Sequence, residues 1–139
     1  MHFRYVTDED IDTLAIMNSQ LIENERHRSE MTVTELENRM RKWLSNKYRA
    51  AVAEEKDKII AYALWRRDPD WIYLRQLFVS RNNRRKGVGS AFINWLYKNA
   101  WRKGKRIRVE ALIVNPEGLA FWRAIGFKDY CITLELERS

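Results

Sequence analysis

The sequence is poor in the residues that stabilise small disulfide-rich scaffolds or build disordered chains. Its 139 residues include one cysteine, two prolines and five glycines. The single cysteine, Cys131, excludes an internal disulfide and a zinc site made of cysteines. The low proline and glycine content excludes collagen-like and proline-rich disordered chains. A chain of this length buries roughly two-thirds of its unfolded surface, so we expect one domain over residues 1–139.

Long apolar segments and metal-ligand clusters are also missing. No apolar run approaches the roughly 20 residues that a membrane span requires, and residues 1–5 lack the apolar core of a secretory signal. The histidines, His2 and His27, are isolated in the sequence and show no metal-ligand spacing. We therefore expect a cytoplasmic protein with no membrane partner and no metal.

Positive charge is concentrated in the second half of the chain. The net charge is +7, but residues 1–60 carry 10 Lys/Arg against 12 Asp/Glu, whereas residues 61–139 carry 16 against 7. Between Arg81 and Arg108 there are ten basic residues and no acidic one. Such a block attracts nucleic acid, a membrane surface or a phosphorylated small molecule, unless it is simply a solvated face.

The spacing of apolar residues predicts alternating strands and helices. We expect strands at residues 3–6, 49–54, 59–66, 71–80, 107–114 and 132–137, and helices beginning near Thr7 or Asp8 and at Val33, Val88 and Glu117. The second helix is preceded by the capping box Thr32-Val33-Thr34-Glu35. The order is β-α-α-β-β-β-α-β-α-β, and the crossover from Trp71 to Val114 requires a parallel strand pair. The sequence therefore predicts a mixed α/β or α+β sheet with helices on both faces.

A basic, glycine-containing loop joins the strand that ends near Ser80 to the helix at Val88. A helix start offers unpaired N–H groups and partial positive charge, and glycine lets a phosphate approach the backbone closely. The loop reads Arg84-Arg85-Lys86-Gly87-Val88-Gly89-Ser90, which suits a pyrophosphate. It is neither a Walker A loop nor a dinucleotide fingerprint. The alternative is a turn in which the glycines only allow the chain to bend.

Several segments in this order resemble the GNAT superfamily of N-acetyltransferases. Arg84-Arg85-Lys86-Gly87-Val88-Gly89 resembles the family signature Arg/Gln-x-x-Gly-x-Gly/Ala, and Leu77-Phe78-Val79 resembles the strand before it. Asn115 and residues 120–127 are similar to the second cofactor-side motif, and residues 3–10 to the first strand and helix start. The resemblance covers nearly the whole chain and implies a mostly antiparallel sheet of six to seven strands.

The resemblance also implies an activity and a site. It implies acetyl-CoA as co-substrate, a small-molecule or peptide primary amine that attacks directly in a ternary complex, and a possible homodimer. It places the pantetheine arm on the backbone of residues 77–79 and on the Asn115 side chain, and the pyrophosphate on the N–H groups of residues 84–90. The implied cofactor-binding residues are Leu77, Phe78, Val79, Arg84, Arg85, Lys86, Gly87, Val88, Gly89, Ser90, Asn115 and Trp122.

Acetylation requires a neutral amine, a polarised thioester carbonyl and a proton for the leaving thiolate. The amide of Phe78 or Val79 could stabilise the oxyanion. The family often supplies the proton from a tyrosine in its last helix, but the matching residue here is Trp122, which could instead only pack near the cofactor. Tyr130 and Tyr97 are alternative proton donors, proposed only because each carries a phenolic hydroxyl.

The general base has one candidate, Glu110, on a mostly apolar strand where burial would raise its pKa. A salt bridge from Glu110 to Arg108 or Arg75 is the alternative, and water could relay the proton instead. Tyr73 occupies the position where some relatives carry a glutamate.

The acceptor is expected to meet residues 23–34, where Glu23, Glu25 and Glu30 could attract a cationic amine or simply be solvated. Cys131 is expected to be a small core residue. Two other functions stay open: a coenzyme A-binding module without catalysis, and a nucleic-acid binder that uses residues 81–108. The second is disfavoured because Phe92, Trp95 and Tyr97 belong largely to a helix face that must pack.

Overall fold

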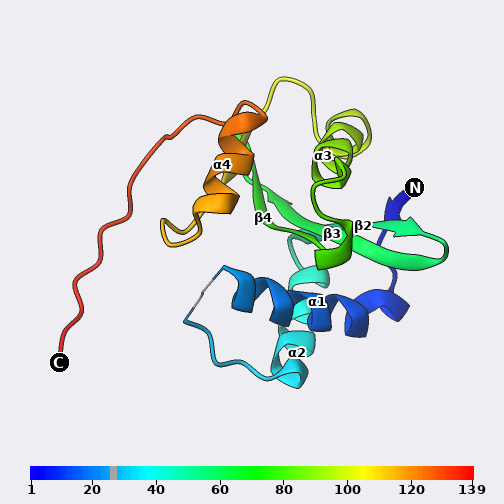
Figure 1. Cartoon of the computed structure of the whole chain (residues 1–139), viewed down its shortest axis with the longest axis horizontal. Helices are drawn as coiled ribbons and strands as arrows, with labels where there is room; N and C mark the ends of the chain where they lie inside the picture. Colours follow the sequence, from blue (N-terminus) through cyan, green and yellow to red (C-terminus); the bar gives the residue numbers. More distant parts are fainter. Residues whose placement is uncertain (26–27) are drawn as a thin grey trace.

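A five-stranded sheet with the order β1-β2-β3-β4-β5 forms the centre of the molecule (Figure 1). The computed structural model describes residues 1–25 and 28–139. The strands are β1 (His2–Tyr5), β2 (Tyr48–Glu55), β3 (Lys58–Arg67), β4 (Trp71–Val79) and β5 (Arg106–Val109). Neighbouring strands are antiparallel except for β4 and β5, which are parallel. The mixed, mostly antiparallel sheet is confirmed, with five strands rather than six or seven.

Helices cover both faces of this sheet, as expected (Figure 1). The helices α1 (Ile11–Asn24) and α2 (Val33–Leu44) pack on one face, and α3 (Val88–Asn99) and α4 (Pro116–Ala124) lie on the other. The predicted capping box at α2 is confirmed: the Glu35 amide donates to Thr32 Oγ1 at 3.2 Å and the Thr32 amide donates to Glu35 Oε1 at 2.9 Å. In the described part of the chain, no helix combines the length and apolar character needed to cross a membrane.

Alternation along the central strands builds one core on each face. In β3, Ala61, Ala63 and Trp65 belong to the core under α3, whereas Tyr62 and Leu64 belong to the core under α1 and α2. Further buried members of the first core are Ile72, Leu74, Phe92 and Leu96, and of the second Leu14, Met40, Val52 and Phe78. β4 contributes side chains to both cores, so packing on its two faces holds the strand between the helical layers.

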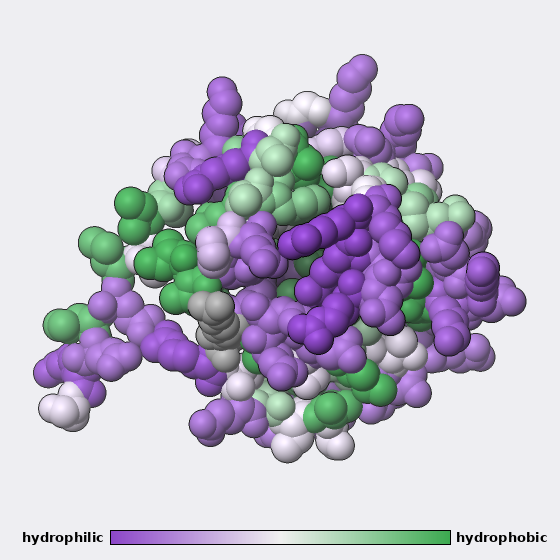
Figure 2. All heavy atoms as spheres, viewed as in Figure 1, coloured by the Kyte–Doolittle hydropathy of each residue, from purple (hydrophilic) through white to green (hydrophobic). Residues whose placement is uncertain are grey.

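The C-terminal part of the chain departs from the sequence prediction. β5 ends at Val109 instead of Val114, and the predicted strand at 132–137 is not formed. Its apolar residues Ile132, Leu134 and Leu136 are 84%, 89% and 83% exposed. The tail leaves the body of the molecule, and Figure 2 shows its hydrophobic side chains standing clear at the left. Alternation predicts a strand only where a second strand supplies hydrogen bonds, and the tail has no such neighbour among the described residues.

Asp10 ties the first strand to the first helical turn. Its carboxylate accepts hydrogen bonds from Arg4 Nη1 at 2.8 Å, Arg4 Nη2 at 2.9 Å and the Thr7 amide at 2.8 Å. The hydrogen bonds from Arg4 are the main reason that the pKa of the Asp10 carboxyl lies below its usual range. A depressed pKa stabilises the fold above the unfolded pKa, and this stability is lost as the pH falls through the folded pKa.

We therefore predict that Asp10→Asn lowers the free energy of unfolding at pH 7 by about 1–3 kcal/mol, because Arg4 loses a charged partner. Urea unfolding should show this deficit shrinking between pH 7 and about pH 2.5, well below the ordinary aspartate pKa of about 3.9. The exposed neighbour Glu9, changed to Gln, is the control. An equal deficit at both pH values would contradict the assignment.

Candidate active site

β4 and β5 separate halfway along β4. Their parallel ladder runs from the pair Trp71 and Arg106 to the pair Leu74 and Val109, and ends there. On its other side, β4 stays paired with β3 as far as Val79. The β3–β4 register shifts at the same place, because Trp65 faces Leu74 and Leu64 faces Gln76, which leaves Arg75 as a bulge. The edge of β4 beyond the bulge is therefore without a strand partner in the described chain.

The register decides which amides face this open edge. The Ser80 amide donates to the Ile60 carbonyl at 2.8 Å, toward β3. Because N–H groups alternate in direction along a strand, the Phe78 amide also faces β3, whereas the Leu77 and Val79 amides face away from it. Of the two amides considered for the oxyanion, the geometry leaves that of Val79.

The open edge leads to the start of α3. Arg85 and Gly87 have φ values of +61° and +79°, so the loop turns sharply through left-handed conformations before the helix begins. The Ala91 amide bonds to the Gly87 carbonyl at 3.0 Å, whereas the amides of residues 85–90 find no hydrogen-bond partner in the described chain. Unpaired donors at a helix start, together with the helix dipole, are features that attract an anion.

Arg84 ties this loop back to β4. Its Nε donates to the Val79 carbonyl at 2.8 Å, and its guanidinium lies 5.4 Å from the Phe78 ring centroid. Arg85 and Lys86 keep exposed or half-exposed side chains beside the unpaired amides. The tribasic run thus divides into one residue that positions the loop and two that supply charge.

α4 packs against the first turn of α3 through Gly89. A Cβ at Gly89 would lie 3.0 Å from two atoms of the Phe121 ring. Trp122 is half-buried, with its ring 4.9 Å from that of Phe121 and 5.1 Å from that of Phe127. Asn115 caps α4, since its Oδ1 accepts a hydrogen bond from the Gly118 amide at 3.2 Å. Of the second predicted motif, the structure therefore shows capping by Asn115 and aromatic packing by Trp122.

Glu110 lies where β4 and β5 separate, but it is not buried as expected. It follows the last residue of β5, is exposed, and accepts a hydrogen bond from the Tyr73 hydroxyl. This bond replaces the alternative salt bridge to Arg108 or Arg75. Burial is the main cause of a raised pKa at Tyr73, and the bond to Glu110 adds to it. Tyr73 therefore keeps its proton and holds the carboxylate in place.

The other candidates from the sequence occupy separate places. Tyr130 is exposed, and the Arg108 guanidinium lies 4.5 Å from its ring and 3.7 Å from that of Trp71. Tyr97 packs on Trp101 near the C-terminal end of α3, far along the helix from its glycine-containing start. Cys131 is exposed, so its assignment to the core is wrong. His27 lies outside the described residues.

The expected acceptor segment shows one half-buried carboxylate. Burial raises the pKa of the Glu25 carboxyl, whereas Glu23 and Glu30 are exposed. The raised pKa disfavours the charged form of Glu25, which makes it a weaker attractor of a cationic amine. The exposure of Glu23 and Glu30 agrees with the alternative that they are simply solvated.

A group of arginines stacked on aromatic rings was missed by the sequence analysis. This arginine–aromatic cluster consists of Arg39 and Trp43 on α2, Tyr48 on β2, Arg66 on β3 and Arg75 on β4. Tyr48 Oη accepts hydrogen bonds from Arg66 at 2.9 Å and from Arg75 at 3.1 Å. Its members come from four elements, and no local pattern in the sequence joins them.

The sequence matches the Acetyltransferase (GNAT) family over residues 14–127, which is most of the chain. The unpaired edge of β4 and the loop at α3 thus occur in a chain that belongs to this family, as its motifs indicated. Comparison with curated protein sequences finds no significant match.

Solved structures share the fold. A possible acetyltransferase from Clostridium difficile 630 has a TM-score of 0.80 at 17% identity, covering 99% of this chain and 97% of that one. A predicted acetyltransferase from Clostridium acetobutylicum, solved with acetyl-CoA, has a TM-score of 0.78 at 21% identity over 98% and 95%. The aminoglycoside N-acetyltransferase AAC(6')-Iy, solved in complex with CoA, has a TM-score of 0.81 at 14% identity over 99% and 93%.

The contact between Gly89 and Phe121 gives a test of how α4 is held against α3. We predict that Gly89→Ala lowers the free energy of unfolding by about 1–3 kcal/mol, because the added methyl group overpacks against the ring. In the Gly89→Ala background, Phe121→Leu should cost less than in the wild type, since the smaller side chain leaves room for the methyl group. Thermal or urea unfolding of all four forms measures this coupling, and strictly additive effects would disprove the contact.

Proposed function

We propose that this acetyltransferase-family chain moves the acetyl group of acetyl-CoA to a primary amine by direct attack in a ternary complex. The observation that carries the proposal is the combination of unpaired amides at the open edge of β4, from Leu77 and Val79, with those of residues 85–90 at the start of α3. A pantetheine arm contains amides that can pair with the free N–H and C=O groups of Leu77 on this edge. The diphosphate suits the N–H groups from Arg85 to Ser90.

The charge around this path supports an anionic co-substrate. The unpaired amides of residues 85–90 lie beside the side chains of Arg85 and Lys86. The first turn of α3 contains no acidic residue. Family members solved with acetyl-CoA and with CoA share this fold. We propose that Asn115 and Trp122, at the two ends of α4, line the same side of the site.

The proposed reaction is a single transfer of the acetyl group from sulfur to nitrogen. The amine nitrogen attacks the thioester carbonyl, a C–N bond forms and the C–S bond breaks. The Val79 amide is placed to stabilise the developing oxyanion. Glu110, held by Tyr73, takes the proton of the amine directly or through water. We propose that Tyr130, whose ring lies against Arg108 of β5, returns a proton to the leaving thiolate.

A coenzyme A-binding module without catalysis is the second candidate. Trp122 favours it, because this residue stands where relatives often carry a proton-donating tyrosine and its ring only packs on Phe121 and Phe127. Release of free thiol from acetyl-CoA in the presence of an amine panel separates this candidate from the enzyme.

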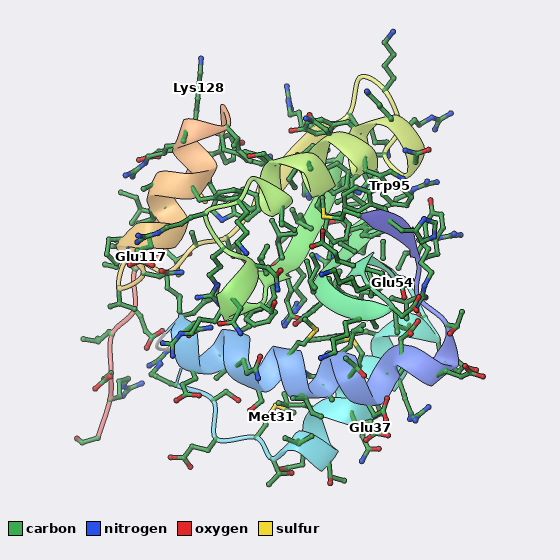
Figure 3. All side chains as sticks on the ribbon, turned by 45° about the vertical axis from the view of Figure 1, so that its right-hand side comes forward. Met31, Glu37, Glu54, Trp95, Glu117 and Lys128 are labelled. Carbon is green, nitrogen blue, oxygen red and sulfur yellow. The ribbon has the colours of Figure 1, made fainter. Side chains whose placement is uncertain are left out.

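Nucleic-acid binding receives less support. The basic residues between Arg81 and Arg108 are divided between the two ends of α3, which are about 16 Å apart for a helix of this length. Two aromatic residues of that block face the protein, since Phe92 is fully buried and Trp95, labelled in Figure 3, stacks on Phe3 with centroids 5.7 Å apart, whereas Tyr97 is 45% exposed. Tyr97 is thus the exposed ring on α3, and it packs on Trp101 at a centroid distance of 5.5 Å, so a row of free rings for base stacking is not formed along the described helix.

The anion site can be tested at Gly87. We predict that Gly87→Glu weakens coenzyme A binding in calorimetry by at least tenfold, because it places a negative charge and a side chain among the phosphate-binding amides. The matched control is Gly104→Glu, which makes the same change at another left-handed glycine, with φ of +86°, beyond the far end of α3. Equal affinities of the two variants would refute the assignment.

The role of Glu110 can be tested by pH–rate profiles. We predict that Glu110→Gln lowers kcat/KM by roughly 10²-fold, the usual scale of general-base catalysis, and changes the shape of the profile. Tyr73→Phe removes only the hydroxyl that holds the carboxylate, so its loss of activity should be smaller. If Glu110→Gln leaves both the rate and the profile unchanged, Glu110 is not the base.

A further inference from the structure

The arginine–aromatic cluster carries positive charge that the chain does not neutralise. Arg39 lies 4.3 Å and Arg75 lies 4.6 Å from the Trp43 ring centroid, so two cations share one indole. Neither Arg39 nor Arg75 forms a salt bridge with another described residue. Residues 26 and 27, which the structure does not describe, are an arginine and a histidine, so neither is acidic. Asp68, which lines the cavity beside the cluster, pairs with Arg66 at 3.0 Å rather than with Arg39 or Arg75.

Maintaining this arrangement without a counter-ion is unfavourable. Burial is the main cause of a lowered pKa at Arg39, and the charge of Arg75 lowers it further. Arg39 Nη2 donates to Asn18 at 3.1 Å, but its buried Nε has no hydrogen-bond partner in the described chain. An unpartnered buried donor on a cation is the kind of group that a bound anion satisfies.

The cluster is connected to the proposed reaction centre. Arg75 is the bulge residue at which β4 and β5 separate. Arg66 lies 4.7 Å from the ring of Tyr73, whose hydroxyl binds Glu110. Contacts therefore run from Glu110 through Tyr73 and Arg66 to the Tyr48 hydroxyl, which also accepts a hydrogen bond from Arg75. A cavity of about 530 Å³ lies on this side of the molecule, and Arg75 touches two of its lining residues, Trp43 and Tyr48. Its charged lining consists of Arg39, Lys42, Lys47, Arg66 and Asp68.

We propose that the acceptor amine carries an anionic group, and that Arg75 and Arg39 bind this group while the amine lies at Glu110. The proposal rests on the acetyltransferase function proposed above. Arginine pairs with carboxylates and phosphates through two parallel hydrogen bonds, so the acceptor class is an amino acid, a short peptide with a free carboxylate, or a phosphorylated amine. A polycationic acceptor such as an aminoglycoside is disfavoured by the same charges.

The experiment uses pairs of amines that differ only in the anion. A dipeptide and its C-terminal amide test a carboxylate, phosphoethanolamine and ethanolamine test a phosphate, and an aminoglycoside serves as the cationic acceptor. Thiol release is measured with acetyl-CoA, and quenching of tryptophan fluorescence is measured without it. We expect the anionic member of at least one pair to have a KM at least tenfold lower and to quench the fluorescence.

Two variants separate recognition of the anion from a general loss of activity. Arg75→Gln should raise the KM for the anionic amine at least tenfold more than it raises the KM for the neutral amine of the same pair. Arg49→Gln, an exposed arginine that alternates with Tyr48 along β2 and so lies on the other face, is the charge-matched control and should change neither.

The outcomes distinguish this inference from the proposed function. Equal or better use of the neutral amines or of the aminoglycoside overturns the inference and leaves the acetyltransferase intact. An unchanged KM in Arg75→Gln also overturns it, as does the absence of quenching by every anionic amine. Failure of acetyl-CoA to bind in calorimetry instead overturns the proposed function.

Discussion

The separation of β4 from β5 after Leu74 and Val109 is the constraint on which the site depends. A strand inside a sheet has all its N–H and C=O groups paired, and unpaired groups are costly unless water or a ligand satisfies them. The bulge at Arg75 leaves one edge of β4 open while both cores hold the strand in place. The protein thereby keeps a rigid row of hydrogen-bonding groups available to another molecule.

Two contacts position the loop and α4 beside the open edge of β4. Arg84 joins the loop to the Val79 carbonyl, and Phe121 packs on Gly89. The strand, the start of α3 and the side of α4 are thus joined by direct contacts. A site built this way is organised before its ligand arrives, which reduces the entropy lost on binding.

Local features of this fold could be predicted from the sequence, and features that depend on distant partners could not. The capping box at Thr32, the loop at Gly87 and the helix at Val88 are set by residues close together in the chain, and all are confirmed. The end of β5 and the lack of a strand after Cys131 depend on which backbones meet, which alternation does not reveal. The burial expected for Glu110 was wrong for the same reason, because the strand that would have buried it ends one residue earlier.

The arginine–aromatic cluster illustrates the same limit for function. Each of its residues has an ordinary interpretation in the sequence, as a solvated cation or a core aromatic residue. Only the fold brings Arg39 of α2 and Arg75 of β4 to the two sides of Trp43. The charge pattern along the chain pointed to residues 81–108, whereas the arginines of this cluster come from three elements that are far apart in the sequence, α2, β3 and β4.

The C-terminal tail has a consequence for how molecules of this protein meet. β5 is the last strand of the sheet, and Ile132, Leu134 and Leu136 lie on a nearby extended segment with no strand beside it. Each molecule therefore has a sheet edge, on β5, and an unpaired extended segment, and the backbones of two such parts can hydrogen-bond to each other. Glu135 and Glu137 beside these leucines lie 2.7 Å and 3.9 Å from the Arg28 guanidinium of the same molecule. Salt screens such exposed ion pairs, so higher ionic strength loosens the tail from its own molecule and leaves its backbone more available to a neighbour.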